Sequence, residues 1–586
     1  MLEAIKEWGD FAKNQGIEES CSELKNIKHV LTIRIRLDKI SFEGVGYEEF
    51  DQSKCGKYLY AKESSRGINY TPTAIITKPE KTFRNRILNW YRKHSNDKSF
   101  NEIYRILAER ENDIIANIND KVRGLRGGIL LTVKFLEGDV EKYLGDYDAY
   151  RRIAKEGIFE RFGNVPSWGT SVGYGKCFLC GEEKEVFGFT LSTADLRFAT
   201  VDKPGFAPDL DREAYVKYMP VCGDCSESLY EGVRFLRKHF DFSFMNDVRY
   251  MVIPHVLDES DCKEIFNIVE KYEGKSYHDG LVAEEDALLE VVKESKGAFT
   301  LFFLFYSERL GRQVVESFVE EVPPSWLRKM YEAQNAVKYD DIFSEEAMKS
   351  IFYKKYDGSL FKHLKVHDKN NWYVTFMEDF CEHENELVDF VSSILWRKQI
   401  SNVYFYFMRK LRQDFYDDDY KFRENVLKSF AVLRFLEKLY MGDYYRDSRY
   451  SMSGNNSLEH SFENFFEKYN ISEPWKKATF AVGVLVRYVL NVQREERGAE
   501  PFRDKLRGLM LDEGHVKRLF RESINKIFEY DRRNPKLEEA VGKYLAEAEG
   551  KFIADMDEIS YYFALGLVLG NIFIYKKSNG QGDKDE

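Results

Sequence analysis

The sequence predicts an α+β protein: a mixed N-terminal α/β region with an inserted four-cysteine module and a β-hairpin, followed by an all-α C-terminal helical bundle. Three observations carry this prediction. Strand-like runs occur almost only before residue 325. Four of the eight cysteines form two C-x-x-C pairs near the middle of the chain. Beyond residue 325, aromatic and aliphatic residues recur at helical spacing to the end.

Length and composition limit the number of domains and the class of protein that the chain can form. The 586 residues correspond to roughly four average domains of about 150 residues each, and an apolar content of 43% excludes wholesale disorder. The first residues, MLEAIKE, lack the apolar core of a signal peptide. The longest uncharged apolar run, 559–575, has 17 residues, fewer than the ~20 that a membrane span needs. We therefore expect a cytoplasmic protein without membrane contact.

We expect five parts along the chain. They are an N-terminal α+β domain (1–164), a zinc-binding four-cysteine module (165–232), an α+β continuation with the hairpin (233–325), a helical region (326–440) and a C-terminal helical bundle (458–577). A stretch rich in Gly, Ser, Asn and Tyr, 441–457, reads as the linker before the bundle.

The N-terminal domain alternates strands and helices. Residues 31–37 alternate apolar and basic side chains, which predicts a half-buried strand with arginines on its open face. Residues 128–135 predict a second, more buried strand. Between them Phe83, Ile87 and Trp90 recur at helical spacing, with basic residues off that stripe.

A basic segment stands out against an acidic chain. Between residues 54 and 98, eleven basic residues face three acidic ones, a net charge of +8, while the whole chain carries −11. Such asymmetry is typical of a surface for an anionic partner. Interspersed aromatic residues offer faces on which unpaired bases can stack; they are Tyr58, Tyr60, Tyr70, Phe83, Trp90 and Tyr91. The alternative is that these charges only form a helix face exposed to solvent.

Glycines and arginines add a second basic feature. The run 123–128, RGLRGG, can present backbone N–H groups and two guanidinium groups to a phosphate. The candidate nucleic-acid-binding residues, chosen on charge, are Arg66, Asn69, Lys81, Arg84, Arg86, Arg92, Lys93, Arg123 and Arg126.

The two cysteine pairs predict a metal site. Cys177 and Cys180 form one C-x-x-C, and Cys222 and Cys225 form the other, each with a glycine typical of a knuckle. Four thiolates in two such pairs suit one tetrahedral Zn²⁺ per chain, and a closed site of four cysteines is structural. The 41-residue spacer exceeds the usual ~15–20, so we expect an insertion there. A redox pair, an iron–sulfur site and free thiols remain alternatives.

After the cysteine module, the sequence predicts a strand, a β-hairpin and then helices. Residues 249–254 predict a strand, and 299–322 predict a β-hairpin. Ser325 is the expected N-cap of a helix over 326–333. In the C-terminal bundle, 480–486 and 563–569 echo each other and are almost wholly apolar, which predicts helices buried on every side. Small-xxx-small spacing at Gly566 and Gly570 predicts close backbone approach.

Signals for catalysis are poor. The sequence has no Walker A loop, no G-x-S-x-G and no H-E-x-x-H. Two His-Asp dipeptides, His278-Asp279 and His367-Asp368, lack evident partner ligands. The acid run 417–419 lacks the glycine and final glutamate of a calcium loop and reads as a solvated helix end. We therefore expect no catalytic residues and no enzyme activity.

Three segments carry a resemblance to a known family. They are 67–74 (GINYTPTA), the two cysteine knuckles in their order, and the hairpin with 304–306 (LFY) and 320–325 (EEVPPS). In these the chain resembles the large subunit of type I-B CRISPR Cascade, an RNA-guided surveillance complex. The likeness spans most of the chain.

The resemblance implies a function. Such a subunit is non-catalytic, joins a guide RNA–protein complex of backbone, RNA-processing and small subunits, and binds target double-stranded DNA beside the protospacer. It assists duplex opening and recruits a separate helicase-nuclease in antiviral defence. The C-terminal bundle resembles the small subunit, and Met441 and Met452 are candidate internal starts for a separate product. The alternatives are a metal-dependent nuclease or phosphohydrolase using a His-Asp dipeptide, and a zinc-stabilised scaffold without direct DNA contact.

Overall fold

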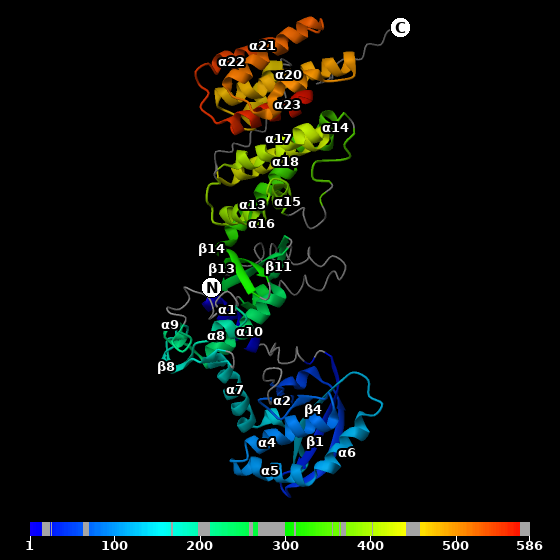
Figure 1. The fold of residues 1–586 in the computed structure, drawn as a ribbon, viewed down its shortest axis with the longest axis vertical. Coiled ribbons are helices and arrows are strands. Elements are labelled where there is room, and N and C mark those ends of the chain that lie inside the picture. Colours follow the sequence, from blue (N-terminus) through cyan, green and yellow to red (C-terminus); the bar gives the residue numbers. More distant parts are fainter. Residues whose placement is uncertain are drawn as a thin grey trace. The chain divides into compact units, whose positions relative to one another are not determined.

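The structure is a computed structural model. It describes residues 1–14, 24, 26–61, 69–165, 168–196, 211–245, 247–256, 262–267, 299–309, 312–353, 355–362, 364, 371–400, 402–440 and 458–574. The chain divides into two compact units, which are described separately. The first is Met1–Asp241, Met251–Lys263 and Tyr306–Val315, and the second is Phe242–Tyr250, Glu264–Phe305 and Glu316–Glu586. The predicted α+β class with a helical C-terminal region is confirmed (Figure 1).

The first unit begins with a five-stranded mixed sheet. Its strands are β1 (Ile27–Arg36), β2 (Ser41–Glu49), β3 (Ala74–Ile75), β4 (Gly128–Glu137) and β5 (Val140–Tyr143), in the order β2-β1-β4-β3 with β5 also on β4. Strands β1 and β4 are parallel, and the other pairs are antiparallel. Both strands expected in this domain are confirmed, with Arg34 and Arg36 half-exposed between buried apolar residues of β1.

Helices between β3 and β4 cover one face of this sheet. They are α3 (Pro79–Thr82), the π-helical turn η3 (Phe83–Leu88), α4 (Asn89–Lys93), α5 (Lys98–Glu109) and α6 (Glu111–Val122). They lie beside β1 and β4 in the blue part of Figure 1. Alternate residues of β1 and β4, such as Leu31, Ile33 and Val133, pack against Phe83 and Trp90 in one buried cluster.

Short elements complete the first unit. They are α1 (Leu2–Asn14), η2 (Gln52–Lys54), α2 (Cys55–Tyr58), η4 (Leu144–Asp146), α7 (Asp148–Gly163), β6 (Asn164–Val165), β7 (Gly169–Thr170), β8 (Val172–Lys176), β9 (Glu183–Phe187), α8 (Thr190–Thr193), α9 (Tyr215–Tyr218), β10 (Val221–Cys222) and α10 (Gly223–His239). Helices α1 and α10 touch backbone to backbone, because a Cβ on Gly9 would lie 1.8 Å from the Ser228 carbonyl oxygen.

A four-stranded sheet contains the hairpin. Its strands are β11 (Asp241–Met245), β12 (Val248–Val256), β13 (Phe299–Arg309) and β14 (Arg312–Val322), in that order across the sheet. The predicted strand over 249–254 and the hairpin over 299–322 are confirmed. The expected cap is wrong: α13 begins at Pro324, Pro323 is its N-cap, and Ser325 lies inside the first turn. Proline suits the first helical position because that N–H has no partner within the helix.

The second unit is helical after the hairpin. Its elements are α13 (Pro324–Lys338), η6 (Asp341–Phe343), α14 (Glu345–Ile351), α15 (Trp372–Glu378), α16 (Glu384–Leu395), α17 (Val403–Asp417), α18 (Asp419–Tyr440), α19 (Leu458–Lys468), α20 (Pro474–Arg497), η9 (Pro501–Leu509), α21 (Glu513–Glu529), α22 (Pro535–Glu547) and α23 (Met556–Ile574). The two echoing segments lie in α20 and α23.

Helices α20 and α23 form the centre of the C-terminal bundle. A Cβ on Gly566 would lie 2.0 Å from the Phe480 carbonyl oxygen, and one on Gly483 would lie 2.3 Å from the Phe563 carbonyl oxygen. The predicted close approach is therefore confirmed. Helix α23 is long and apolar enough to cross a membrane, but 78% of its apolar window is buried inside the protein. It serves here as a core helix.

The C-terminal bundle shares its core with the helices before it. The Tyr404 hydroxyl of α17 lies 3.3 Å from that of Tyr562 on α23, and Arg412 forms an ion pair of 2.6 Å with Asp557. Both helical parts expected from the sequence thus belong to one compact unit. The expected linker, 441–457, and the candidate starts Met441 and Met452 lie outside the described residues.

Candidate metal centre and candidate nucleic-acid interface

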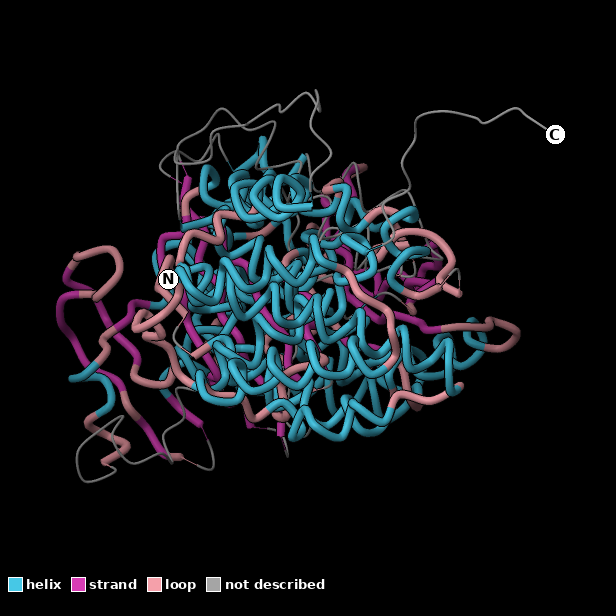
Figure 2. Tube along the Cα trace, turned by 90° about the horizontal axis from the view of Figure 1, so that it is seen from above, coloured by secondary structure: helices cyan, strands magenta, loops and turns pink. Residues whose placement is uncertain are grey.

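Three short strands bring the two cysteine pairs together. Cys177 directly follows β8, Cys222 ends β10, and β9 pairs with both of these strands. Cys180 lies in the turn after β8, and Cys225 in the first turn of α10. In Figure 2 this module is the group of strands and loops at the left. The sheet therefore joins pairs that are 41 residues apart in the sequence.

The four sulfur atoms have the spacing of a tetrahedral metal site. All four Sγ atoms lie within 4.8 Å of one another, and those of Cys180 and Cys222 are 3.8 Å apart. Zinc–sulfur bonds of about 2.3 Å place tetrahedral sulfurs about 3.8 Å apart. Three of the cysteines are buried and Cys180 is exposed. The four side chains can therefore hold one metal ion, with every tetrahedral position filled by protein.

Backbone groups orient the sulfurs. The Cys222 N–H donates to Cys177 Sγ at 3.3 Å. Gly181 closes the first knuckle at a φ of +73°, a conformation that favours glycine. Gly223 follows Cys222 where a Cβ would lie 2.2 Å from the Phe159 ring. Both knuckle glycines are thus explained by geometry.

Electrostatics favour a cation among the thiols. The neighbouring Cys225 thiol lowers the pKa of Cys222 to about 5, and the Cys222 sulfur raises the pKa of Cys225. Burial raises the pKa of Cys180. Four adjacent sulfurs cannot all ionise together unless a positive charge joins them. Two lysines lie close by, since Lys155 and Lys184 reach Asp224 at 2.7 and 3.7 Å.

The spacer between the cysteine pairs is a folded insertion in its described parts. It contains β9, α8 and α9, while 197–210 lie outside the described residues.

The charge-based candidates for nucleic-acid binding are distributed unevenly. The exposed ones are Lys81, Arg84, Arg92, Lys93, Arg123 and Arg126. Arg86 is half-buried, and Arg66 lies outside the described residues. Asn69 is only 6% exposed, and its amide donates to the Thr73 carbonyl oxygen at 2.5 Å. Asn69 therefore holds the chain in place and offers little surface to a ligand.

Ion pairing divides the exposed candidates further. Arg84 pairs with Glu80 and Glu111, and Arg92 donates to Asn89 at 2.5 Å. Four other exposed candidates form neither an ion pair nor a side-chain hydrogen bond with any residue that the structure describes, and we name them the four unpaired cations: Lys81, Lys93, Arg123 and Arg126. The last two flank Gly124, which has a φ of +91°.

The aromatic residues of the basic segment are core residues. The expectation that they offer stacking faces is wrong for Tyr58, Tyr60, Phe83, Trp90 and Tyr91, which are all buried. Trp90 stacks on His94 and Tyr150. The helical spacing that made these residues visible in the sequence is the spacing of a core-facing stripe. This part of the surface offers charge to phosphates and few ring faces to bases.

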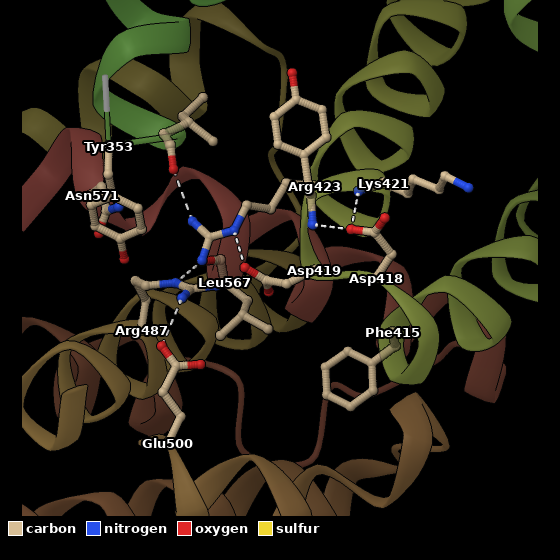
Figure 3. A network of polar contacts seen from close by, with 12 residues as sticks. Tyr353, Phe415, Asp418, Asp419, Lys421, Arg423, Arg487, Glu500, Leu567 and Asn571 are labelled. Atoms are coloured by element: carbon tan, nitrogen blue, oxygen red, sulfur yellow. Dashed lines mark hydrogen bonds and ion pairs between the residues drawn. The ribbon is translucent and has the colours of Figure 1, made fainter. Parts of the chain in front are cut away.

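The acid run at the start of α18 is not simply solvated. Asp418 caps the helix by accepting the N–H of Tyr420 at 2.9 Å. Asp419 instead points inward, where Arg423 donates to it at 2.8 Å (Figure 3). Arg503 donates to the same carboxylate at 2.6 Å. Burial favours its neutral form, but the surrounding arginines hold its pKa well below the usual range.

Sequence reasoning missed this arginine network. Its members come from α18, α20 and η9 and are too far apart in sequence to form a motif. Both His-Asp dipeptides of the alternative enzyme hypothesis lie outside the described residues.

Comparison with protein families decides the relationship. Three domain models of the CRISPR-associated protein TM1802 (cas_TM1802) match the chain: the N-terminal domain at residues 1–156, the central domain at 174–322 and the C-terminal domain at 374–581. The chain belongs to the cas_TM1802 family. The suspected Cascade large-subunit family is thereby confirmed. A search of curated proteins finds no match.

Proposed function

We propose that this cas_TM1802 protein is a non-catalytic subunit of a guide RNA–protein complex that binds the phosphates of target double-stranded DNA. In this proposal it assists duplex opening and recruits a separate helicase-nuclease. The four cysteines hold a structural Zn²⁺ that joins the module between β8 and α10.

The observation that carries the proposal is the set of four unpaired cations on an otherwise acidic chain. A net charge of −11 disfavours general attraction of nucleic acid. Lys81, Lys93, Arg123 and Arg126 nevertheless remain exposed without carboxylate partners among the described residues. Cations without internal partners are available to neutralise phosphates.

The burial of the aromatic residues favours duplex DNA over single-stranded DNA as the ligand. Unpaired strands are usually held by stacking on exposed rings, whereas duplex DNA is positioned mainly through its phosphates. Among the described residues, the basic segment combines exposed charge with mostly buried rings, which favours the duplex. Sequence recognition can be left to the guide RNA, since base pairing reads the target in such complexes.

Zinc is the proposed metal because of the donor set. Four thiolates in tetrahedral spacing suit Zn²⁺ and leave no position for a reacting water. When bound, the ion supplies a cross-link between β8, β10 and α10. The cysteines themselves would hold the ion, and the knuckle N–H groups orient their sulfurs.

Charge reversal tests the proposal. We would compare the full chain carrying Lys81→Glu and Lys93→Glu with a control carrying Lys536→Glu and Lys551→Glu, which makes the same change of charge on α22 and on the loop that follows it. Binding of a fluorescent DNA duplex is measured by anisotropy over a salt series. Each lost phosphate contact lowers the log–log salt slope by about 0.9, so the first variant should lose about two units of slope and the control none.

The alternatives give different results. A scaffold without DNA contact shows no salt-sensitive binding in any variant. Equal slopes for both double variants would remove the four unpaired cations from the proposal.

A further inference from the structure

The buried arginine network in the second unit contains more positive than negative charge. Arg423 is 2% exposed and Arg487 is fully buried. Around them lie Arg494 and Arg503, and two carboxylates, Asp419 and Glu500, face this group. Buried charges are normally paired, because an uncompensated one is costly to remove from water.

Asp419 accepts hydrogen bonds, whereas Glu500 forms ion pairs and leaves its buried Oε1 without a hydrogen bond among the described residues. Asp419 accepts from Arg423 at 2.8 Å and from Arg503 at 2.6 Å. Glu500 lies 2.6 Å from Arg494 but 3.9 Å from Arg487, too far for a hydrogen bond. Figure 3 shows Arg423 and Arg487 reaching toward the same region from α18 and α20.

Two guanidinium nitrogens in this region lack hydrogen-bond partners among the residues that the structure describes. Arg423 uses Nε on Asp419 and Nη1 on the Ile351 carbonyl oxygen at 2.8 Å, which leaves its Nη2 unpartnered. Arg487 uses Nε on the Leu567 carbonyl oxygen at 2.8 Å, which leaves its Nη1 unpartnered. Buried donors of this kind ordinarily have acceptors.

A tyrosine connects the region to the surface. The Arg423 and Arg494 guanidinium carbons lie 5.1 and 4.8 Å from the centre of the Tyr353 ring. Tyr353 is 38% exposed, and the Arg494 side chain is 40% exposed. Burial opposes ionisation of this phenol, yet Arg487, Arg423 and Arg494 together lower its pKa. Tyr353 therefore lies among positively charged side chains.

From these contacts we infer an oxyanion site, where a phosphate group binds between Arg423, Arg487 and Arg494 beside Tyr353. Planar guanidinium forks match the oxygens of phosphate, and such charge-assisted hydrogen bonds are strong. The phosphate would supply acceptors for the unpartnered nitrogens and offset the excess charge. This inference does not rest on the proposed DNA contact in the first unit.

The test uses thermal unfolding of the full chain with inorganic phosphate as the probe. Sodium phosphate is titrated against sodium chloride of equal ionic strength, and the unfolding midpoint is followed by tryptophan fluorescence. A ligand that binds only the folded state raises the midpoint in a saturable way. We expect saturation with phosphate and a smaller, unsaturated effect with chloride.

A variant at the exposed edge of the site and a matched control test where the phosphate binds. Arg494→Gln should weaken the apparent phosphate affinity at least tenfold, the size of one charge-assisted hydrogen bond. Arg497→Gln makes the same change on an exposed arginine of the same helix and should leave the affinity unchanged. These surface variants avoid the folding defect expected if Arg423 or Arg487 were replaced.

A second probe distinguishes the source of the phosphate. Hexathymidylate replaces inorganic phosphate in the same titration. Saturation at lower concentration, lost in Arg494→Gln, assigns the site to a nucleic-acid backbone, and saturation with inorganic phosphate alone assigns it to the free ion. Equal effects of phosphate and chloride, or equal responses of the two arginine variants, would overturn the inference.

Discussion

Replacing Gly566 by alanine should strongly destabilise the C-terminal helices. The new Cβ would lie 2.0 Å from the Phe480 carbonyl oxygen and 2.8 Å from its carbonyl carbon. Ordinary contacts of this kind are roughly 3.5 Å, so α20 and α23 would have to separate by more than about 1 Å. The Cβ is fixed directly to the backbone and the Phe480 carbonyl oxygen belongs to it, so no side-chain rotation relieves the clash.

The expected change in the free energy of unfolding is the sum of opposing contributions. Alanine gains about 1 kcal/mol in helix propensity over glycine. Overpacking costs about 1–3 kcal/mol or more, and separating the most extensively packed helix pair of the unit adds lost dispersion contacts. We expect a net loss of about 3 kcal/mol, which lowers the melting midpoint by roughly 6–12 °C.

A second glycine provides the control. A Cβ on Gly542 in α22 meets only the Phe520 ring, at 3.8 Å. Gly542→Ala should therefore stabilise the protein by about 0.5–1 kcal/mol. Thermal melts of the two variants and the unchanged chain measure the difference. If Gly566→Ala melts within 2 °C or so of the unchanged chain, the described contact between α20 and α23 is wrong.

Three further results are expected. Metal analysis should find one zinc ion per chain, lost in Cys222→Ser and retained in Cys381→Ser, and equal zinc in both variants would exclude the four-cysteine site. Residues 458–586 expressed alone should melt well below the full chain, because Arg503 loses its partners Phe415 on α17 and Asp419 on α18, and an equal melting midpoint would contradict the shared core. Arg409 hydrogen-bonds to Glu386 and lowers the pKa of the Glu386 carboxyl group from 4.5 to about 2. The stabilisation from this ion pair is therefore complete above about pH 4.5 and declines as the pH falls toward 2. This decline should be missing from acid titrations of Glu386→Gln, whereas an unchanged acid transition would refute the ion pair.

The cysteine site and the hairpin were predictable because their signals are local. Two C-x-x-C pairs are recognisable from spacing alone, and the strand β9 that joins them in space is not needed to predict them. The hairpin over 299–322 combines two apolar runs with a turn. The close contact of α20 with α23 was also readable, because Gly566 and Gly570 share one helix face.

The errors arise where one pattern has two physical meanings. A periodic stripe such as Phe83, Ile87 and Trp90 marks a buried face as readily as a stacking platform, and burial proves the former. The role of Asp419 depends on Arg487 and Arg503, which follow it by 68 and 84 residues. Charge pairing over such separations is set by helix packing, and a single sequence does not reveal it.

We propose that the chain binds duplex DNA and leaves its cleavage to another protein. The most direct measurement incubates the purified full chain with end-labelled duplex DNA and Mg²⁺ or Mn²⁺, and then separates bound from free DNA and intact from cleaved strands. We expect salt-sensitive retention of DNA that stays at full length. Metal-dependent fragments that disappear in Asp279→Ala or Asp368→Ala would contradict it.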